Sequence, residues 1–161
     1  MATKKKQEER KSIAVNRKAR HDYQVLETYE AGISLTGTEV KSCRGGTMSL
    51  AQSYVHFEPR AAKLVNANIA TYAMGSYNNH VPTRQRQLLL HKVEIRRLKR
   101  AVEAKGLTVI PLQAYFDDKG HVKLDLGLCR GKNVQDKRED LKEKIDRRET
   151  DRLMKSRKFK G

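Results

Sequence analysis

Residues 107–128, LTVIPLQAYFDDKGHVKLDLGL, hold the pattern that decides the fold. In the second half of this stretch apolar residues alternate strictly with Lys123, Asp125 and Gly127; the apolar residues are Val122, Leu124, Leu126 and Leu128. A period of two predicts a strand with one face in the core and one in water. The turn sequence Asp117–Gly120 precedes it, and two short apolar runs, 107–112 and 114–116, precede the turn. We therefore expect an antiparallel pair of strands here.

Further short strands are predicted on the amino-terminal side of this pair. Residues 23–29 mix β-branched and aromatic side chains, and Glu30-Ala31-Gly32 is expected to break that strand. Residues 53–57 and 62–69 flank the turn sequence 58–61 and predict a hairpin. Between these strands, residues 36–42 predict a short helix that begins at Thr36 or Thr38 and ends at Gly45-Gly46.

One long helix is predicted from Pro82-Thr83 to Gly106. Apolar and aromatic positions recur every three or four residues along it and predict a face that packs on the sheet: Leu88, His91, Ile95, Leu98 and Val102. Basic side chains are expected to project away from that face, namely Arg86, Lys92, Arg96, Lys99 and Arg100. Leu89 falls on the basic side of this helix, as a peripheral core residue or an apolar contact for a partner.

Several short strands joined by tight turns favour a mainly β fold with helices, of the α+β class. We expect a small oligonucleotide-binding-like β-barrel with one long helix and one or two short ones. The 161-residue chain has 35 Lys and Arg against 19 Asp and Glu, a net charge of +16, and only 37% hydrophobic residues. This length allows one compact domain, and the low apolar share indicates that part of the chain stays outside its core.

The positive charge is concentrated in three segments, which carry +6 in residues 1–20, +6 in 84–105 and +5 in 131–161. We therefore predict a basic, disordered amino-terminal arm over 1–20, a barrel that binds RNA over 21–130, and a basic tail over 131–161. The tail is rich in helix formers but has few apolar residues, so we expect it to be disordered when free and helical when bound. Such a charge distribution points to nucleic acid as the partner.

The sequence does not indicate a membrane protein, a secreted protein, or a protein built on zinc or disulfides. The chain has no apolar stretch of membrane-spanning length, and MATKKKQEER lacks the apolar segment of a secretory signal, so we expect a cytoplasmic protein. Cys43 and Cys129 lie far apart without ligand spacing, which predicts neither a zinc site nor a disulfide. No cofactor, metal or oligomer signal is visible, and we expect a monomer.

No catalytic arrangement stands out either. His21 and Asp22 could pair as a base and its orienting carboxylate, but neighbours on a strand point to opposite faces. The segment 127–133 has three residues between its glycines, where a phosphate loop needs four. Gly131 could instead let the backbone approach an RNA phosphate, with Lys132 adding a positive charge.

Several strings along the chain are more specific than composition. They include NRKARHDY at 16–23, EAGI at 30–33, EVKS at 39–42 followed by Arg44, NH at 79–80, and LLL at 88–90. Three further strings follow toward the carboxyl end: Lys123, Gly131-Lys132 and DKR at 136–138. From Ile13 to Met154 the sequence closely resembles the SmpB family, the SsrA-binding proteins of bacterial ribosome rescue.

The resemblance implies a function. Proteins of this family bind the tRNA-like domain of transfer-messenger RNA and carry it into the empty decoding site of a stalled ribosome, where the protein replaces the missing anticodon arm. The nascent peptide is then tagged for degradation and the ribosome is released. Through that RNA the family also implies indirect partners, elongation factor Tu and alanyl-tRNA synthetase.

The resemblance also implies two sets of site residues. Those expected to contact transfer-messenger RNA are His21, Glu30, Arg44, Leu89 and Lys123. Those expected near the decoding centre and message channel of the small ribosomal subunit are Gly131, Lys132, Gln135, Asp136, Lys137, Arg138, Leu153 and Met154. Gln135 stands where some relatives carry His, so a role that needs a charged or stacked imidazole is not implied here.

Two alternatives remain at this point. A general single-stranded RNA-binding or ribosome-associated barrel would explain the charge and the fold but not the clustered strings. A ribonuclease would need an acid and a base beside the scissile phosphate, for which only His21 is a candidate.

Overall fold

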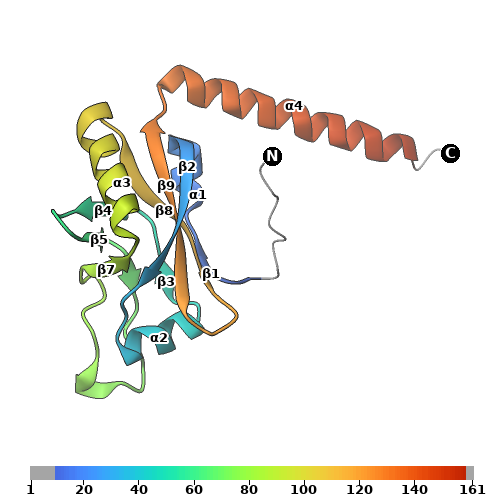
Figure 1. Ribbon diagram of the computed structural model, residues 1–161. Helices are drawn as coiled ribbons and strands as arrows, with labels where there is room; N and C mark the ends of the chain where they lie inside the picture. Colours follow the sequence, from blue (N-terminus) through green and yellow to red (C-terminus); the bar gives the residue numbers. More distant parts are fainter. Residues whose placement is uncertain (1–9, 159–161) are drawn as a thin grey trace. The chain divides into compact units, whose positions relative to one another are not determined.

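The computed structural model describes residues 10–158, and these divide into two units at Arg130/Gly131 (Figure 1). The first unit is built around an antiparallel sheet with strand order β1-β8-β9-β2-β7-β5-β4. Its strands are β1 (Lys11–Val15), β2 (Tyr23–Ile33), β4 (Tyr54–Phe57), β5 (Ala62–Val65), β7 (Arg86–Leu89), β8 (Thr108–Phe116) and β9 (Val122–Gly131). The predicted α+β class is confirmed.

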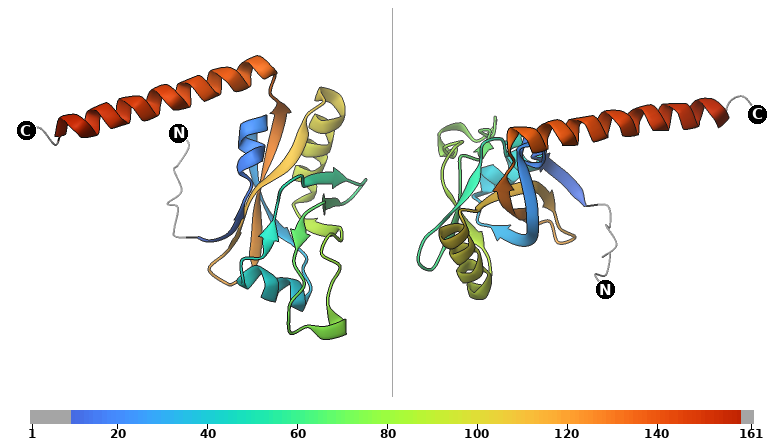
Figure 2. Two further views of the ribbon diagram at one scale, coloured as in Figure 1. Left: turned by 180° about the vertical axis from the view of Figure 1, so that it is seen from behind. Right: turned by 90° about the horizontal axis from the view of Figure 1, so that it is seen from above.

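The sheet curls on itself, because β4 at one end also packs against β8, near the other end (Figure 2). A second, two-stranded sheet pairs β3 (Met48–Ser49) with β6 (Asn68–Ile69). The helices of this unit are α1 (Arg17–Asp22), α2 (Gly37–Arg44), a 3-10 turn η1 (Ser76–Asn78) and α3 (Lys92–Lys105). One long and two short helices therefore accompany the sheet.

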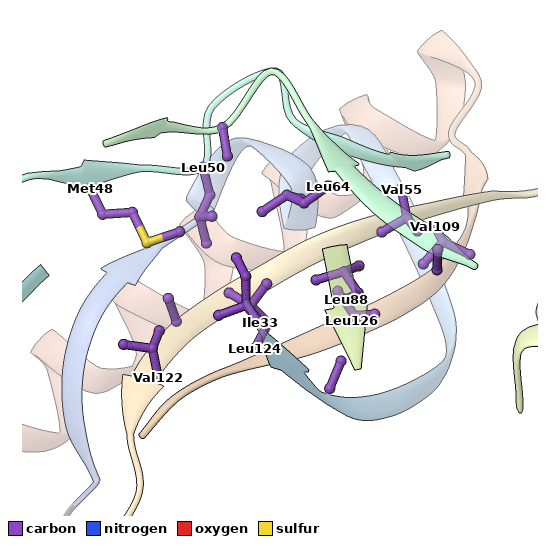
Figure 3. Close-up of a cluster of buried hydrophobic side chains, with 14 of the residues drawn as sticks. Ile33, Met48, Leu50, Val55, Leu64, Leu88, Val109, Val122, Leu124 and Leu126 are labelled. Carbon is purple, nitrogen blue, oxygen red and sulfur yellow. The ribbon is translucent and has the colours of Figure 1, made fainter. Parts of the chain in front are cut away.

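The core fills the inside of the curl. All four alternating residues of β9 named above are buried, as predicted. They belong to one cluster with Val55 of β4, Leu64 of β5, Val109 of β8 and Leu88 of β7, and Leu88 lies beside Leu126 within it (Figure 3). The residues between them on β9 face the other way, so Lys123 and Asp125 lie on the outer face of the sheet, where a binding site can form.

Residues 11–20 are ordered, and the prediction of a disordered arm through residue 20 is wrong for them. β1 pairs with β8. The buried Asn16 caps α1 by accepting a hydrogen bond from the Ala19 amide, and its side-chain NH₂ donates to the carbonyls of Leu50 and Pro111, both at 3.1 Å. Through these three hydrogen bonds the buried Asn16 side chain holds residues 11–20 on the sheet. The arm residues 1–9 lie outside the described residues.

Two strand boundaries in the structure differ from those predicted from the sequence. β2 continues through Glu30-Ala31-Gly32 to Ile33, although a break was expected there. Gly32 pairs with Leu89, and a Cβ at this position would lie only 3.2 Å from the Leu89 Cβ, so the glycine allows close packing rather than ending the strand. The strand predicted over 62–69 is divided by Asn66, whose φ of 62° turns the chain from β5 to β6. The predicted hairpin is confirmed, with residues 54–57 paired to residues 62–65.

The long helix predicted from Pro82 is shorter than expected. Residues 86–89 form β7, which lies between β2 and β5, and α3 begins only at Lys92. Gly106, with φ of 61°, ends the helix as predicted, and Ile95 and Leu98 are buried as predicted. The spacing from Leu88 to His91 and Ile95 suits a helix, but Leu88 reaches the core through the alternation of a strand.

Arg86 corrects the sequence prediction most strongly. It was expected to project into solvent, but its side chain is fully buried. It is buried because Glu39 of α2 lies beside it: the Arg86 Nε donates to Glu39 Oε1 at 2.8 Å, and its other nitrogens donate to the carbonyls of Ala67, Arg84 and Pro82. A buried cation is tolerated only with partners of this kind.

The second unit, from Gly131, contains one helix, α4 (Val134–Lys158). We expected this tail to be disordered without a partner, and the structure instead has a continuous helix over it. Its sequence is dominated by good helix formers, and local contacts at its start, described below, support the first turn. Residues 159–161 lie outside the described part of the chain.

Within residues 10–158 no helix is long and apolar enough to cross a membrane. Cys43 and Cys129 are both free and buried. Burial raises the pKa of each thiol to about 11, so both remain protonated at neutral pH.

Candidate nucleic-acid interface

Three of the predicted site residues meet at one hollow on the outer face of the sheet. Glu30 of β2, Leu89 of β7 and Lys123 of β9 line a shallow cavity of about 330 Å³, together with Gly32, Leu90, His91 and Glu94. The three residues lie 34 to 93 positions apart in the sequence, and they come together because β9, β2 and β7 are neighbours in the sheet. We call this cavity the sheet hollow.

Glu30 is the centre of a polar cluster beside the sheet hollow. Its Oε1 accepts a hydrogen bond from Lys123 Nζ at 2.7 Å, and its Oε2 accepts one from the Tyr115 hydroxyl at 2.6 Å. These two bonds, with the positive charge of Lys123 and Arg10, outweigh the effect of partial burial and lower the pKa of Glu30 below its ordinary value. Glu30 is therefore ionised at neutral pH and fixes the position of Lys123.

Two residues of this cluster were missed by sequence reasoning. Tyr115 lies directly opposite Lys123 in the β8–β9 ladder, and Arg10 places its guanidinium 4.5 Å from the centre of the Tyr115 ring and 3.7 Å from Glu30 Oε2. The tight turn at Asp117–Gly120 sets the β8–β9 register, so the pairing of Tyr115 with Lys123 could have been derived from the sequence. Arg10 carries no such signal.

Leu89 supplies the apolar part of the sheet hollow. It was predicted to lie on the long helix, whereas it lies on β7, with 59% of its surface exposed. Its neighbour Leu88 points into the core, so Leu89 must point outward. A large apolar side chain beside an ion-paired lysine offers one contact for a base or sugar and one for a phosphate.

The other two residues predicted to contact RNA lie elsewhere. His21 is in the last turn of α1, separated from Glu30 by about 25–30 Å of extended strand. Its Nδ1 lies 2.9 Å from Asp22 Oδ1, so the expectation that the two side chains point to opposite faces is wrong, because they end a helix rather than occupy a strand. Arg44 is exposed at the carboxyl end of α2. Neither lines the sheet hollow.

The predicted ribosomal residues all fall at the end of β9 or in the second unit. Gly131 ends β9; Lys132 pairs with Asp140, and the Asn133 amide donates to Asp136 Oδ2 at 3.3 Å. These contacts brace the first turns of α4, where Gln135, Lys137 and Arg138 lie. Leu153 and Met154 are 67% and 64% exposed near the other end of the helix.

No group of His, Cys, Asp or Glu in the described residues is arranged to hold a metal ion. The arrangement can present cations, hydrogen-bond donors and one apolar side chain to a polyanion.

Comparison with known proteins gives one family over most of the chain. The family model described as "SmpB protein" matches residues 13–156. An SsrA-binding protein of Streptomyces coelicolor is 49% identical over 149 residues, covering 92% of this chain and 93% of the relative. An SsrA-binding protein of Thermus thermophilus is 54% identical over 136 residues, covering 84% of this chain and 94% of the relative.

A solved structure described as "tmRNA-SmpB: a journey to the center of the bacterial ribosome" contains a similar chain. It matches with a TM-score of 0.64 and 55% sequence identity, over 74% of this chain and 84% of the other.

Proposed function

The chain belongs to the SmpB family, and on that premise we propose that it binds the tRNA-like domain of transfer-messenger RNA and delivers it to stalled ribosomes in trans-translation. The observation that carries this proposal is the sheet hollow. Three residues at which the family resemblance implies RNA contact, Glu30, Leu89 and Lys123, gather there from three strands.

We further propose separate tasks for the two units of the chain. The first unit holds transfer-messenger RNA through the sheet hollow, and His21 and Arg44 contact other parts of the same RNA. Gly131 and the start of α4 bind at the decoding centre, and the exposed Leu153 and Met154 pack in the vacant message channel. This adjacent apolar pair, exposed near the far end of a mostly charged helix, supports a docking role for that end.

The proposed role needs no catalysis, because the protein acts as an adaptor between two RNAs. We propose that it works in the cytoplasm as a monomer, and that elongation factor Tu and alanyl-tRNA synthetase join the complex through transfer-messenger RNA. The alternative is a general RNA-binding protein, which the surplus of 16 positive charges would also favour.

Purification of the tagged protein from its own cells, followed by sequencing of the retained RNA, separates the two functions. At about 0.3 M salt most non-specific phosphate binding is lost. We expect strong enrichment of one structured RNA with a tRNA-like end and a short reading frame. A broad mixture of RNAs would favour the general RNA-binding protein instead.

Deletion of residues 137–161 tests the division of tasks. Affinity for transfer-messenger RNA is expected to stay within about threefold, because the sheet hollow is intact, whereas peptide tagging on stalled ribosomes is expected to disappear. Gel-shift titration and a tagging reaction measure the two activities. Equal loss of both would show that the tail is not a separate ribosomal element.

A further inference from the structure

A second hollow, of about 290 Å³, lies between α3 and the β4–β5 turn. Its lining combines three cations, Arg60, Lys92 and Arg96, with two apolar residues, Pro59 and Ile95. No carboxylate is among the described residues that line it. We call it the hairpin hollow. None of its three cations is among the residues that the family resemblance marks as contacts for RNA.

The three cations of the hairpin hollow differ from three neighbours, Lys63, Arg97 and Lys99, on the same hairpin and helix. Arg60, Lys92 and Arg96 are exposed and make no side-chain hydrogen bond or ion pair within residues 10–158. Nearby cations are already neutralised: Lys63 pairs with Glu58 at 2.6 Å, Arg97 with Glu27 at 3.1 Å and Lys99 with Glu103 at 3.8 Å. Three cations without a side-chain partner therefore converge on one cavity, and together they give it a positive potential.

The hairpin hollow and the sheet hollow are both lined by residues at the start of α3. His91 and Glu94 line the sheet hollow, and the interleaved residues Lys92, Ile95 and Arg96 line the hairpin hollow. One turn of helix thus separates the two cavities. A helix is about 10 Å wide, which corresponds to roughly three nucleotides of an RNA strand at about 3.4 Å each. An RNA that occupies the sheet hollow can reach the hairpin hollow without leaving the surface.

We propose that the tRNA-like domain of transfer-messenger RNA extends from the sheet hollow across the first turn of α3, and that Arg60, Lys92 and Arg96 bind its backbone phosphates. The three cations suit the charged phosphates, and the two apolar residues of the hairpin hollow suit the adjoining sugars, which are less polar. This extension rests on the proposed function, because it takes its RNA from the sheet hollow. It assigns a new phosphate-binding site to the hairpin and α3.

The test compares two triple variants with the same change in net charge. The first is Arg60→Ala, Lys92→Ala and Arg96→Ala, which empties the hairpin hollow of cations. The matched control is Lys63→Ala, Arg97→Ala and Lys99→Ala, which removes three paired cations from the same hairpin and helix. All six side chains lie at the surface or partly so, and circular dichroism with thermal unfolding checks that both full-length variants fold.

Affinity for the isolated tRNA-like domain is then measured by filter binding between about 50 and 200 mM salt. We expect the hairpin-hollow variant to bind about 10- to 100-fold more weakly near 150 mM and its salt slope to fall by about 2–3, as loss of three phosphate contacts requires. The control is expected to stay within about threefold, with its slope unchanged.

Other results would overturn the extension. Equal weakening of both triples would reduce the effect to net charge, and unchanged affinity of the first would exclude a contact. If the first triple bound the RNA normally but failed to associate with ribosomes, the occupant would be ribosomal RNA. Failure of the proposed function is recognised separately, because the wild-type protein would then not prefer this RNA over an unrelated RNA of equal length.

Discussion

Two glutamates of this protein make similar contacts in opposite surroundings. Glu39 is fully buried and accepts hydrogen bonds from Arg84, Arg86 and the Thr36 amide at 2.5 to 2.8 Å. Glu30 has 44% of its side chain exposed and accepts from Lys123 and Tyr115 at 2.6 to 2.7 Å. The distances alone do not distinguish them, so burial must decide what each one contributes.

Burial makes the Glu39 cluster structural and leaves the Glu30 cluster available for binding. Glu39 and Arg86 are both fully buried, so no solvent can replace the carboxylate, and removing its charge leaves Arg86 without a counter-charge in the interior. Around Glu30, water replaces a lost partner at little cost, and a phosphate can compete for Lys123. The first cluster ties α2 to β7, and the second orients a cation on the face that β7 helps to form.

The largest expected effect comes from Glu39→Gln. The substitution keeps the shape of the side chain but leaves the fully buried Arg86 without a counter-charge, and it should lower the free energy of unfolding by about 3–5 kcal/mol. The matched change Glu30→Gln removes the same charge at the exposed cluster and should cost about 1 kcal/mol or less. Urea unfolding followed by circular dichroism measures both. Equal losses would mean that burial does not separate the clusters.

The pH dependence of stability should come mainly from the same buried cluster. Burial by itself raises the pKa of Glu39, but the hydrogen bonds from Arg84, Thr36 and Arg86 outweigh it and lower the pKa from 4.5 to about 2. Since the folded pKa is below the unfolded one, this stability is complete above pH 4.5 and is lost as the pH falls toward 2. The loss amounts to about 3 kcal/mol.

Unfolding in urea at intervals from pH 6 to pH 2.5 measures this loss. The Glu39→Gln variant should lack most of the decline, and Glu30→Gln should keep it. A wild-type protein with constant stability across this range would contradict the assignment of the low pKa to Glu39.

The sequence predicted those elements whose pattern is local. The alternation of β9, the hairpin of β4 and β5, and the short helix α2 follow from side-chain period and turn residues within ten positions of each other. The prediction from the sequence failed at β7 because the burial of Arg86 depends on Glu39, 47 positions away. No local rule expects a buried arginine, so the strand was assigned to the helix that follows it.

The candidate site shows the same limit. The outward direction of Lys123 followed from the alternation of its strand. Leu89 was named from its place on the basic side of the expected helix, as a peripheral core residue or a partner contact, and Glu30 was singled out only by family resemblance. Their meeting at one cavity depends on the order β9-β2-β7, which joins distant segments and cannot be derived from pairs of neighbours in the sequence. Arg10 was missed for the same reason, since β1 is added to the sheet by a long-range pairing with β8.

At the exposed cluster, the expected effect is on binding rather than stability. Lys123→Ala should weaken binding of the tRNA-like RNA by about tenfold, reduce the salt slope by about 1, and change the free energy of unfolding by less than about 1 kcal/mol. Lys119→Ala is the control, because Lys119 lies exposed in the β8–β9 turn and its side chain makes no hydrogen bond or ion pair within the described residues. An equal effect of both would point to net charge alone.

The smallest effect should come from Tyr115→Phe, which removes one hydroxyl from the exposed cluster. The ring stays packed under Arg10, so the free energy of unfolding should fall by only about 1 kcal/mol. Glu30 then keeps Lys123 but loses a donor to its Oε2, and its pKa should rise toward the ordinary value. Carbon-detected NMR titration of the Glu30 carboxyl measures that shift, and gel-shift titration should show RNA binding weakened only about two- to threefold. If the pKa of Glu30 stayed unchanged, its ionisation would depend on Lys123 and Arg10 alone, and Tyr115 would be a packing residue rather than one that positions Glu30.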